Sequence, residues 1–363
     1  MNEKIEKIIV IIGLLAAIAL SLSAHSLVLK EFMMPTYGNT MVHVATATEL
    51  INSGYYPWED YSYGGRIPNL YVPGYRFDLA QLVLLTGFPI DFASRFLVML
   101  FAVLLPLSFF VLGRALFGEK AGVLCAFFAS LAPEMLIYTI RPLPQAMGLA
   151  ILPLALWTLL KNNRAGALVF AITLSLIHQE SAVFFAGVAF AYGIAQYAVG
   201  KLGVRGDKKS ANTALLAWLV CTITYLGWHF AVLGNLNLWD LAQFKYHEGG
   251  VVSSEFFFTH TGIVVSWLSI AGGVLLVLGF FASVRSRKEW HEALFLLAAF
   301  AVSLFAIKND VVGLRVFMDR FLVYAQIVLI PLAAFAVLEL YKIVSLAIRG
   351  ELIISPRVFE RRQ

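Results

Sequence analysis

Ionisable side chains stand at the edges of apolar segments in this chain, where they could hold an anionic group. His178 and Glu180 lie in LIHQESAVF, between two apolar segments, and Arg315 and Arg320 lie in KNDVVGLRVFMDRFL, just before the last one. At membrane depth such groups are unfavourable unless they face a cavity or a partner. Arginine binds phosphate oxygens through several N–H donors, so a phosphate site is one interpretation. A salt bridge between an arginine and a neighbouring aspartate, locking two helices together, is the other.

Carboxylates also lie in a polar, aromatic stretch nearer the N-terminus. Glu59 and Asp60 occur in YYPWEDYSYGGRIPNLYVPGYRF, with His43 upstream of them. A carboxylate there could act as a general base or orient an acceptor. The alternatives are a solvated loop tip or a helix N-cap for the two acids, and a satisfied interfacial residue for the histidine.

The composition shows which elements must position these residues. The chain of 363 residues is 60% hydrophobic and only 13% charged, which excludes a soluble globule with an ordinary charged surface. Apolar stretches suited to crossing a bilayer predict an all-α bundle of about ten spans. They lie at roughly 8–29, 90–112, 120–140, 142–160, 165–178, 181–200, 212–234, 261–284, 291–307 and 320–346.

Basic residues predict the orientation of this bundle. Most of the 27 lysines and arginines fall on one side if the N-terminus is cytoplasmic, so both termini are expected in the cytoplasm of a multi-pass membrane protein. The segment 30–89 is then a long outer loop. Its two apolar-polar stretches, about 40–52 and 77–85, are too short to span and predict two interfacial helices. No linker divides residues 1–363, which predicts a single membrane domain.

Four stretches of this chain carry a resemblance to a family. They are GNTMVHVATATELINSGYYPWED, NLYVPGYRFDLAQLVLLTGFPIDFASRFL, LFGEKAGVLCAFFASLAPEMLIYTIRP and DRFLVYAQIVLIPLAA. Together they resemble the GT-C class of polytopic glycosyltransferases, which includes the oligosaccharyltransferase catalytic subunit and protein mannosyltransferases. The resemblance implies a sugar transferase that uses a polyprenyl-phosphate-linked donor outside the membrane, with the first outer loop built from two interfacial helices.

The same resemblance assigns residue roles. The family places an aspartate just after the first span, and Asn39 stands there in this chain, beside His43. Because asparagine cannot accept a proton, Glu59 and Asp60 become the candidates for the base. The second acidic motif of some members is replaced by RPLPQ at 141–145, so a divalent metal has no clear site, and no cofactor is expected with certainty.

Two other classes of function stay open at this point. A GT-C-like protein without catalysis could bind lipid-linked glycan, as Asn39 would allow, and a transporter is a further alternative. A transporter would be expected to show two matching halves with broken helices, and the sequence shows no such symmetry. Expected partners are a polyprenyl-phosphate sugar donor and membrane lipid, and no nucleic acid, because the basic residues form short clusters between the spans rather than one face.

Overall fold

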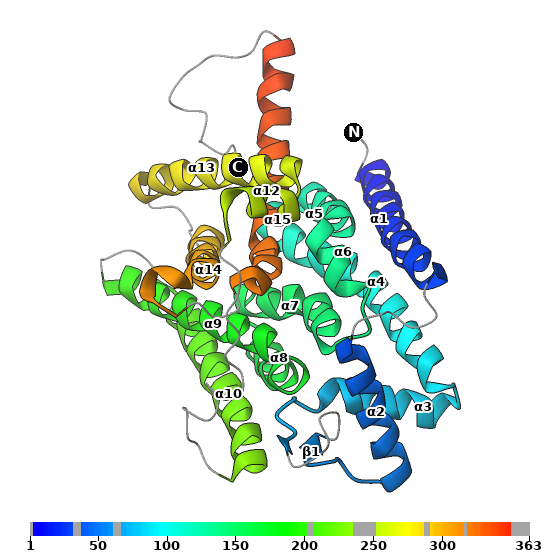
Figure 1. The fold of residues 1–363 in the computed structure, drawn as a ribbon. Coiled ribbons are helices and arrows are strands. Elements are labelled where there is room, and N and C mark those ends of the chain that lie inside the picture. Colours follow the sequence, from blue (N-terminus) through cyan, green and yellow to red (C-terminus); the bar gives the residue numbers. More distant parts are fainter. Residues whose placement is uncertain are drawn as a thin grey trace.

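The chain folds almost entirely into α-helices, which confirms the all-α prediction (Figure 1). The computed structural model describes residues 3–31, 38–60, 67–201, 206–234, 252–286, 291–314 and 318–349. Within them, five helices are long and apolar enough to cross a membrane. These are α1 (Glu3–Glu31), α4 (Ile90–Phe117), α9 (Gln179–Lys201), α10 (Lys208–Leu233) and α15 (Met318–Ile348).

Two bent helix pairs raise that number to seven if each pair makes one span. They are α5 (Glu119–Leu131) with α6 (Pro133–Thr139), bent by 65°, and α12 (Ser254–Thr261) with α13 (Ile263–Ser286), bent by 107°. Pro133 at the start of α6 and Gly262 at φ +85° explain the two breaks. Proline lacks the N–H that would bond to the preceding turn and so favours the first turn of a helix, and glycine tolerates positive φ.

Three shorter apolar helices complete the match to the predicted apolar segments. They are α7 (Pro144–Leu160), α8 (Arg164–Ile177) and α14 (His291–Ile307), followed by a short 3-10 turn, η2 (Asn309–Val312). Every predicted apolar segment therefore has a helix or a bent pair. That all of them cross the bilayer stays a prediction.

Helices α4 and α5 pack closely because small residues face each other. A side chain at Gly113 would collide with Cys125, and one at Gly122 would lie 2.7 Å from the carbonyl oxygen of Phe110. Small residues let helix backbones approach where lipid gives no hydrophobic force between helices. The most buried long helix is α15, with 78% of its apolar window inside the protein, so it forms the centre of the bundle.

The predicted first loop has its own small fold at one end of the bundle (Figure 1). Helix α2 (Gly38–Ser53) and helix α3 (Gly74–Thr86) pack against each other. Between them, β1 (Glu59–Asp60) pairs antiparallel with β2 (Ile67–Pro68). Stacking of Trp58 on Trp228, 5.8 Å between ring centroids, fastens this ribbon to the C-terminal end of α10.

Candidate functional site

His178 occupies the break between α8 and α9. Its backbone is extended (φ −154°, ψ 126°), which ends α8, and α9 then starts at Gln179. A helix that began here would normally present Glu180 and Ser181 to solvent or lipid, yet both are buried. The break therefore turns three polar side chains into the bundle.

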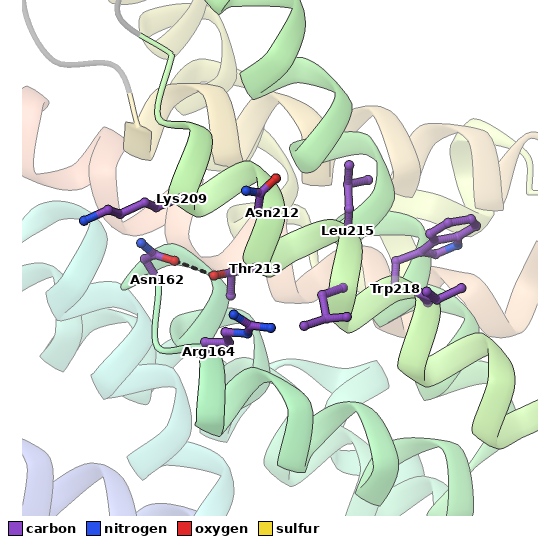
Figure 2. A pocket seen from close by; sticks show the side chains of 9 residues that line it. Asn162, Arg164, Lys209, Asn212, Thr213, Leu215 and Trp218 are labelled. Carbon is purple, nitrogen blue, oxygen red and sulfur yellow. Dashed lines mark hydrogen bonds between the residues drawn. The ribbon is translucent and has the colours of Figure 1, made fainter.

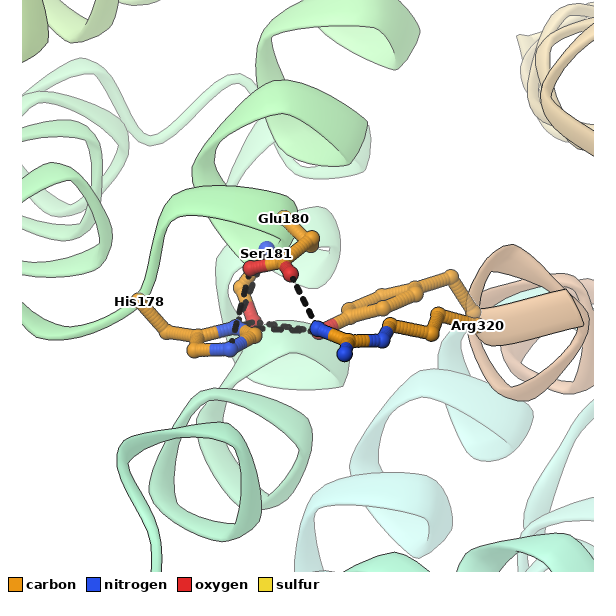
Figure 3. Close-up of polar contacts among 5 residues, drawn as sticks. His178, Glu180, Ser181 and Arg320 are labelled. Atoms are coloured by element: carbon orange, nitrogen blue, oxygen red, sulfur yellow. Dashed lines mark hydrogen bonds and ion pairs between the residues drawn. The ribbon is translucent and has the colours of Figure 1, made fainter. Parts of the chain in front are cut away.

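These side chains form a hydrogen-bonded group with two residues of α15 (Figure 3). We name it the helix-end cluster: His178, Glu180, Ser181, Arg320 and Tyr324. Nε2 of His178 lies 3.1 Å from Oε2 of Glu180. Nδ1 of His178 lies 3.0 Å from the Tyr324 hydroxyl and 3.1 Å from Oγ of Ser181. Segments that are 140 residues apart in the chain are thus joined by polar contacts.

Glu180 determines how the imidazole of His178 is used. The negative charge of the carboxylate, 3.1 Å from Nε2, favours the tautomer with the proton on that nitrogen, although Oε2 has no hydrogen-bond partner among the described residues. Nδ1 is then an acceptor, which suits the two hydroxyls of Ser181 and Tyr324. The cluster consequently fixes the orientation of the His178 ring. It also holds the Glu180 carboxylate between His178 and Arg320.

Arg320 reaches the same carboxylate from the first turn of α15. Its Nη1 lies 3.5 Å from Oε1 of Glu180, and its side chain is 31% exposed while that of Glu180 is 5% exposed. The predicted helix-locking ion pair thus involves Glu180, and Asp310 pairs with Lys308 at 3.4 Å. The predicted phosphate ligand Arg315 lies outside the described residues.

A second polar group lies inside the first loop. We name it the first-loop cluster: His43, Tyr56, Asn69 and Arg76. The guanidinium of Arg76 is fully buried and donates to Nδ1 of His43 at 3.1 Å, to the Tyr56 hydroxyl at 2.5 Å and to Oδ1 of Asn69 at 2.8 Å. Burial, the charge of Arg76 and that of His178 hold the pKa of His43 well below its ordinary value of 6.5. His43 is therefore neutral.

The two clusters are neighbours because α3 starts against the end of α8. A Cβ at Gly74 would lie 2.7 Å from the carbonyl oxygen of Leu176, so only glycine allows this approach. Gly148 of α7 packs in the same way against Ser181 and His178. His178 is near enough to His43 to contribute to the lowering of its pKa. The structure thus brings together four of the predicted residues, namely His43, His178, Glu180 and Arg320.

The other predicted residues lie at the surface of the first loop. Asn39 is exposed in the first turn of α2, and Glu59 is exposed on β1. Asp60 is paired with Ile67 through the backbone, and its side chain is outside the described part of the chain. The contacts that define the helix-end cluster involve none of these three residues, so their part in catalysis stays a prediction.

Sequence reasoning did not single out Arg76, Ser181 or Tyr324. Tyr324 and Ser181 occur within apolar helices and look like core residues, and Arg76 looks like one of several polar residues in an aromatic loop. The helpful signal was PGYRF, since a glycine two residues before the arginine can mark a close backbone contact. No three His, Cys, Asp or Glu side chains gather as a metal site within the described ranges.

Comparison with solved structures gives the fold a precedent. The chain is similar to the archaeal oligosaccharyltransferase AglB from Archaeoglobus fulgidus in complex with an inhibitory peptide and a dolichol-phosphate, with a TM-score of 0.67 and 14% identity over 99% of this chain. The chain is similar to two further structures of the Archaeoglobus fulgidus oligosaccharyltransferase. The apo form gives a TM-score of 0.62 and 13% identity over 93% of this chain, and the complex with Zn and sulfate gives a TM-score of 0.61 and 15% identity over 94% of it.

This likeness confirms the GT-C resemblance at the level of the fold. The chain spans about half the length of these neighbours, covering 53%, 52% and 51% of them. No family model matches the sequence, and no curated protein matches it. At such identities the likeness carries no residue roles, so these must come from the clusters themselves.

Proposed function

We propose that this chain is a GT-C-type membrane glycosyltransferase that takes a sugar from a polyprenyl-phosphate-linked donor at the extracytoplasmic face. The observation that carries the proposal is the helix-end cluster, in which Arg320 and His178 meet at Glu180 within a bundle of apolar helices. A neighbour with the same fold was solved with a dolichol-phosphate, which supports the choice of donor.

Arg320 would hold the phosphate of the donor, with His178 placed beside it by their shared partner Glu180. Transfer of a glycosyl group leaves negative charge on the lipid phosphate, and a fixed guanidinium in a partly dry site stabilises it. Arg320 is the partly exposed member of the ion pair, so its guanidinium can turn from Glu180 to a ligand. Glu180 sets the position of Arg320 before the ligand arrives.

The acceptor would be oriented by the first loop. We keep Glu59 and Asp60 as the proposed carboxylates, because the ribbon that carries them is fastened to the bundle through Trp58. The ribbon lies next to exposed aromatic side chains, and this position suits a sugar or peptide acceptor. Helices α2 and α3 would lie along the outer membrane surface, and the first-loop cluster would keep them in place.

An apolar cavity between α13, α14 and α15 offers room for the polyprenyl tail. Its volume is about 480 Å³, and nearly all lining side chains are apolar, among them Val274, Leu278 and Leu304, which are about half exposed. Such a wall faces the lipid in a membrane-spanning bundle. A tail could therefore enter from the bilayer without passing through water.

The proposed topology has ten spans, with both termini cytoplasmic and residues 30–89 outside. Both native cysteines, Cys125 and Cys221, are buried, so an introduced cysteine would dominate labelling by a charged, membrane-impermeant reagent. Asn52→Cys on α2 should label in intact cells, and Lys161→Cys only after lysis. The opposite pattern would overturn the side assigned to the reaction.

The test of the proposed function is a sugar-transfer assay in isolated membranes. We expect Arg320→Ala to lower turnover by about 10²-fold to 10³-fold. Loss of the true base should lower turnover by about 10²-fold to 10⁴-fold. The two single variants Glu59→Gln and Asp60→Asn, compared with each other, should therefore show which carboxylate acts. Lys308→Ala, which removes another cation near the start of α15, and Asp91→Asn are matched controls. Unchanged turnover in Arg320→Ala would refute the phosphate role.

Exposed Asn39 favours one second candidate, a GT-C-like protein that binds the lipid-linked glycan without transferring it. In that case the wild type binds polyprenyl phosphate and transfers no sugar. Binding that is lost in Arg320→Ala, together with transfer gained in Asn39→Asp, would support this candidate over the enzyme.

A further inference from the structure

A cavity of about 710 Å³ lies at the far end of α8 from the helix-end cluster (Figure 2). Its walls are the first residues of α8 and the N-terminal half of α10, and α8 has 14 residues. At about 1.5 Å per residue, about 20 Å separates the two places. The cavity is therefore distinct from the site proposed above, and it has the volume of an ordinary small-molecule site.

One part of this cavity is cationic. Arg164 and Lys209 contribute to its lining, and no carboxylate is among the lining residues that the structure describes. Asn162 and Thr213 lie between them and are joined by a hydrogen bond of 2.6 Å that ties the turn before α8 to α10 (Figure 2). Two cations are thus carried on a fixed frame with polar amide and hydroxyl groups beside them.

The rest of the cavity is apolar. Leu215, Leu216, Trp218 and Leu219 line it, and Leu219 is 44% exposed. Lys209 and Trp218 are nine positions apart, or about 13 Å along the helix. Figure 2 shows the lysine and the tryptophan at opposite ends of the lining. A ligand that satisfies both ends must be an amphiphile with an anionic head.

We infer that this cavity binds an anionic phospholipid, with its phosphate between Arg164 and Lys209 and an acyl chain along Leu219 and Trp218. Helix α10 is long and apolar enough to span, and only 17% of its apolar window is buried, so its outer face meets lipid. Basic pockets between membrane helices are a recurrent way to bind such headgroups. A free phosphate would use the cations and leave the apolar wall uncovered. The inference does not depend on the proposed function.

The test uses the full chain in nanodiscs of phosphatidylcholine with increasing brominated phosphatidylglycerol, whose bromine atoms quench nearby tryptophan. Trp218→Phe identifies the part of the quenching that belongs to Trp218. We expect that part to saturate at a low fraction of the brominated anionic lipid. Arg164→Gln with Lys209→Gln should raise the half-saturating fraction about thirtyfold, and each single variant about fivefold.

Two controls make the result decisive. Lys161→Gln with Lys208→Gln removes the same charge from exposed neighbours that do not line the cavity, and it should leave half-saturation within about twofold. Inorganic phosphate in millimolar excess should not displace the lipid. Equal quenching by brominated phosphatidylcholine, equal loss in both double variants, or displacement by phosphate would each overturn the inference.

Discussion

The helix-end cluster and the first-loop cluster both place a cation next to a histidine, but they balance its charge differently. Arg320 shares the carboxylate of Glu180 with His178, and its side chain keeps 31% of its surface exposed. Arg76 is completely buried, and within the described ranges its hydrogen bonds go to uncharged acceptors. An ion pair that is open on one side can exchange its partner for a ligand, whereas a sealed cation can only hold its surroundings together.

This difference in exposure indicates that the helix-end cluster is a site and that the first-loop cluster is a structural anchor. The helix-end cluster is expected to respond to ligand, and the first-loop cluster is expected to determine whether the loop keeps its fold.

The largest effect on stability should come from Arg76→Met. The substitution leaves buried acceptors on His43 and Asn69 without their donor, and each orphaned acceptor costs about 1–3 kcal/mol. Relief of the buried charge offsets part of this, so we expect a loss of about 3 kcal/mol in unfolding by denaturing detergent in mixed micelles. Arg114 is 57% exposed, and Arg114→Met should change stability by less than about 0.5 kcal/mol. Equal effects would mean that Arg76 is no anchor.

Glu180→Gln should have a smaller effect on stability than Arg76→Met. Breaking a buried ion pair costs about 3–5 kcal/mol, but Arg320 can turn toward solvent, which we expect to reduce the loss to about 2 kcal/mol. The same unfolding measurement checks this loss of stability. Glu339→Gln, which removes one partner of the Lys342–Glu339 surface ion pair, is the control. A loss larger than that of Arg76→Met would reverse the assignment of anchor and site.

Much of this arrangement follows from the sequence, because lipid permits few backbone solutions. Each predicted apolar segment became a helix or a bent pair, and prolines and glycines in residues 55–77 prevented a long helix there. His178, Glu180 and Arg320 were recognisable because ionisable groups are rare at membrane depth. The pairing of Glu180 with Arg320 was not, since it joins residues 140 positions apart.

The role of Arg76 was hidden for a different reason. A sequence of tyrosines, prolines and one arginine reads equally well as an exposed loop and as a buried network, and only the packing of Gly74 on Leu176 decides between them. Glu59 lies exposed on β1, and its role as the base stays a prediction. Loop chemistry depends on tertiary contacts that local patterns do not contain.

Acidification should loosen the first loop. The pKa of His43 is lowered in the folded chain by burial, Arg76 and His178, so the unfolded chain takes up the proton first as the pH falls below 6.5. Stability is therefore complete above that pH and declines below it, by on the order of 1 kcal/mol at pH 5.5.

The measurement is the unfolding midpoint at pH 7.5 and 5.5, for the wild type and for His43→Gln. His43→Gln should be less stable at pH 7.5 and should lose less on acidification. Tyr71 and Tyr75, whose rings contact His43, do not titrate in this range. A wild type and variant that respond identically would show that another group senses the pH.

The smallest effect should come from the two hydroxyls that face Nδ1 of His178. Ser181 at 3.1 Å and Tyr324 at 3.0 Å compete to donate to this nitrogen, and the two hydroxyls lie 3.3 Å from each other. The nitrogen has one lone pair, so it accepts from one of them at a time.

Ser181→Ala and Tyr324→Phe should each cost about 0.5 kcal/mol, because the other hydroxyl takes over. The double variant leaves the nitrogen with only the long contact from the Ser181 backbone N–H, at 3.4 Å, and should cost about 1 kcal/mol more than the sum. The cycle measures this excess directly, and Thr158→Ala with Tyr324→Phe, at sites without a shared acceptor, should be additive. Strict additivity in the Ser181 cycle would mean that the two hydroxyls do not share Nδ1 as an acceptor, so that Glu180 does not place the proton of His178 on Nε2.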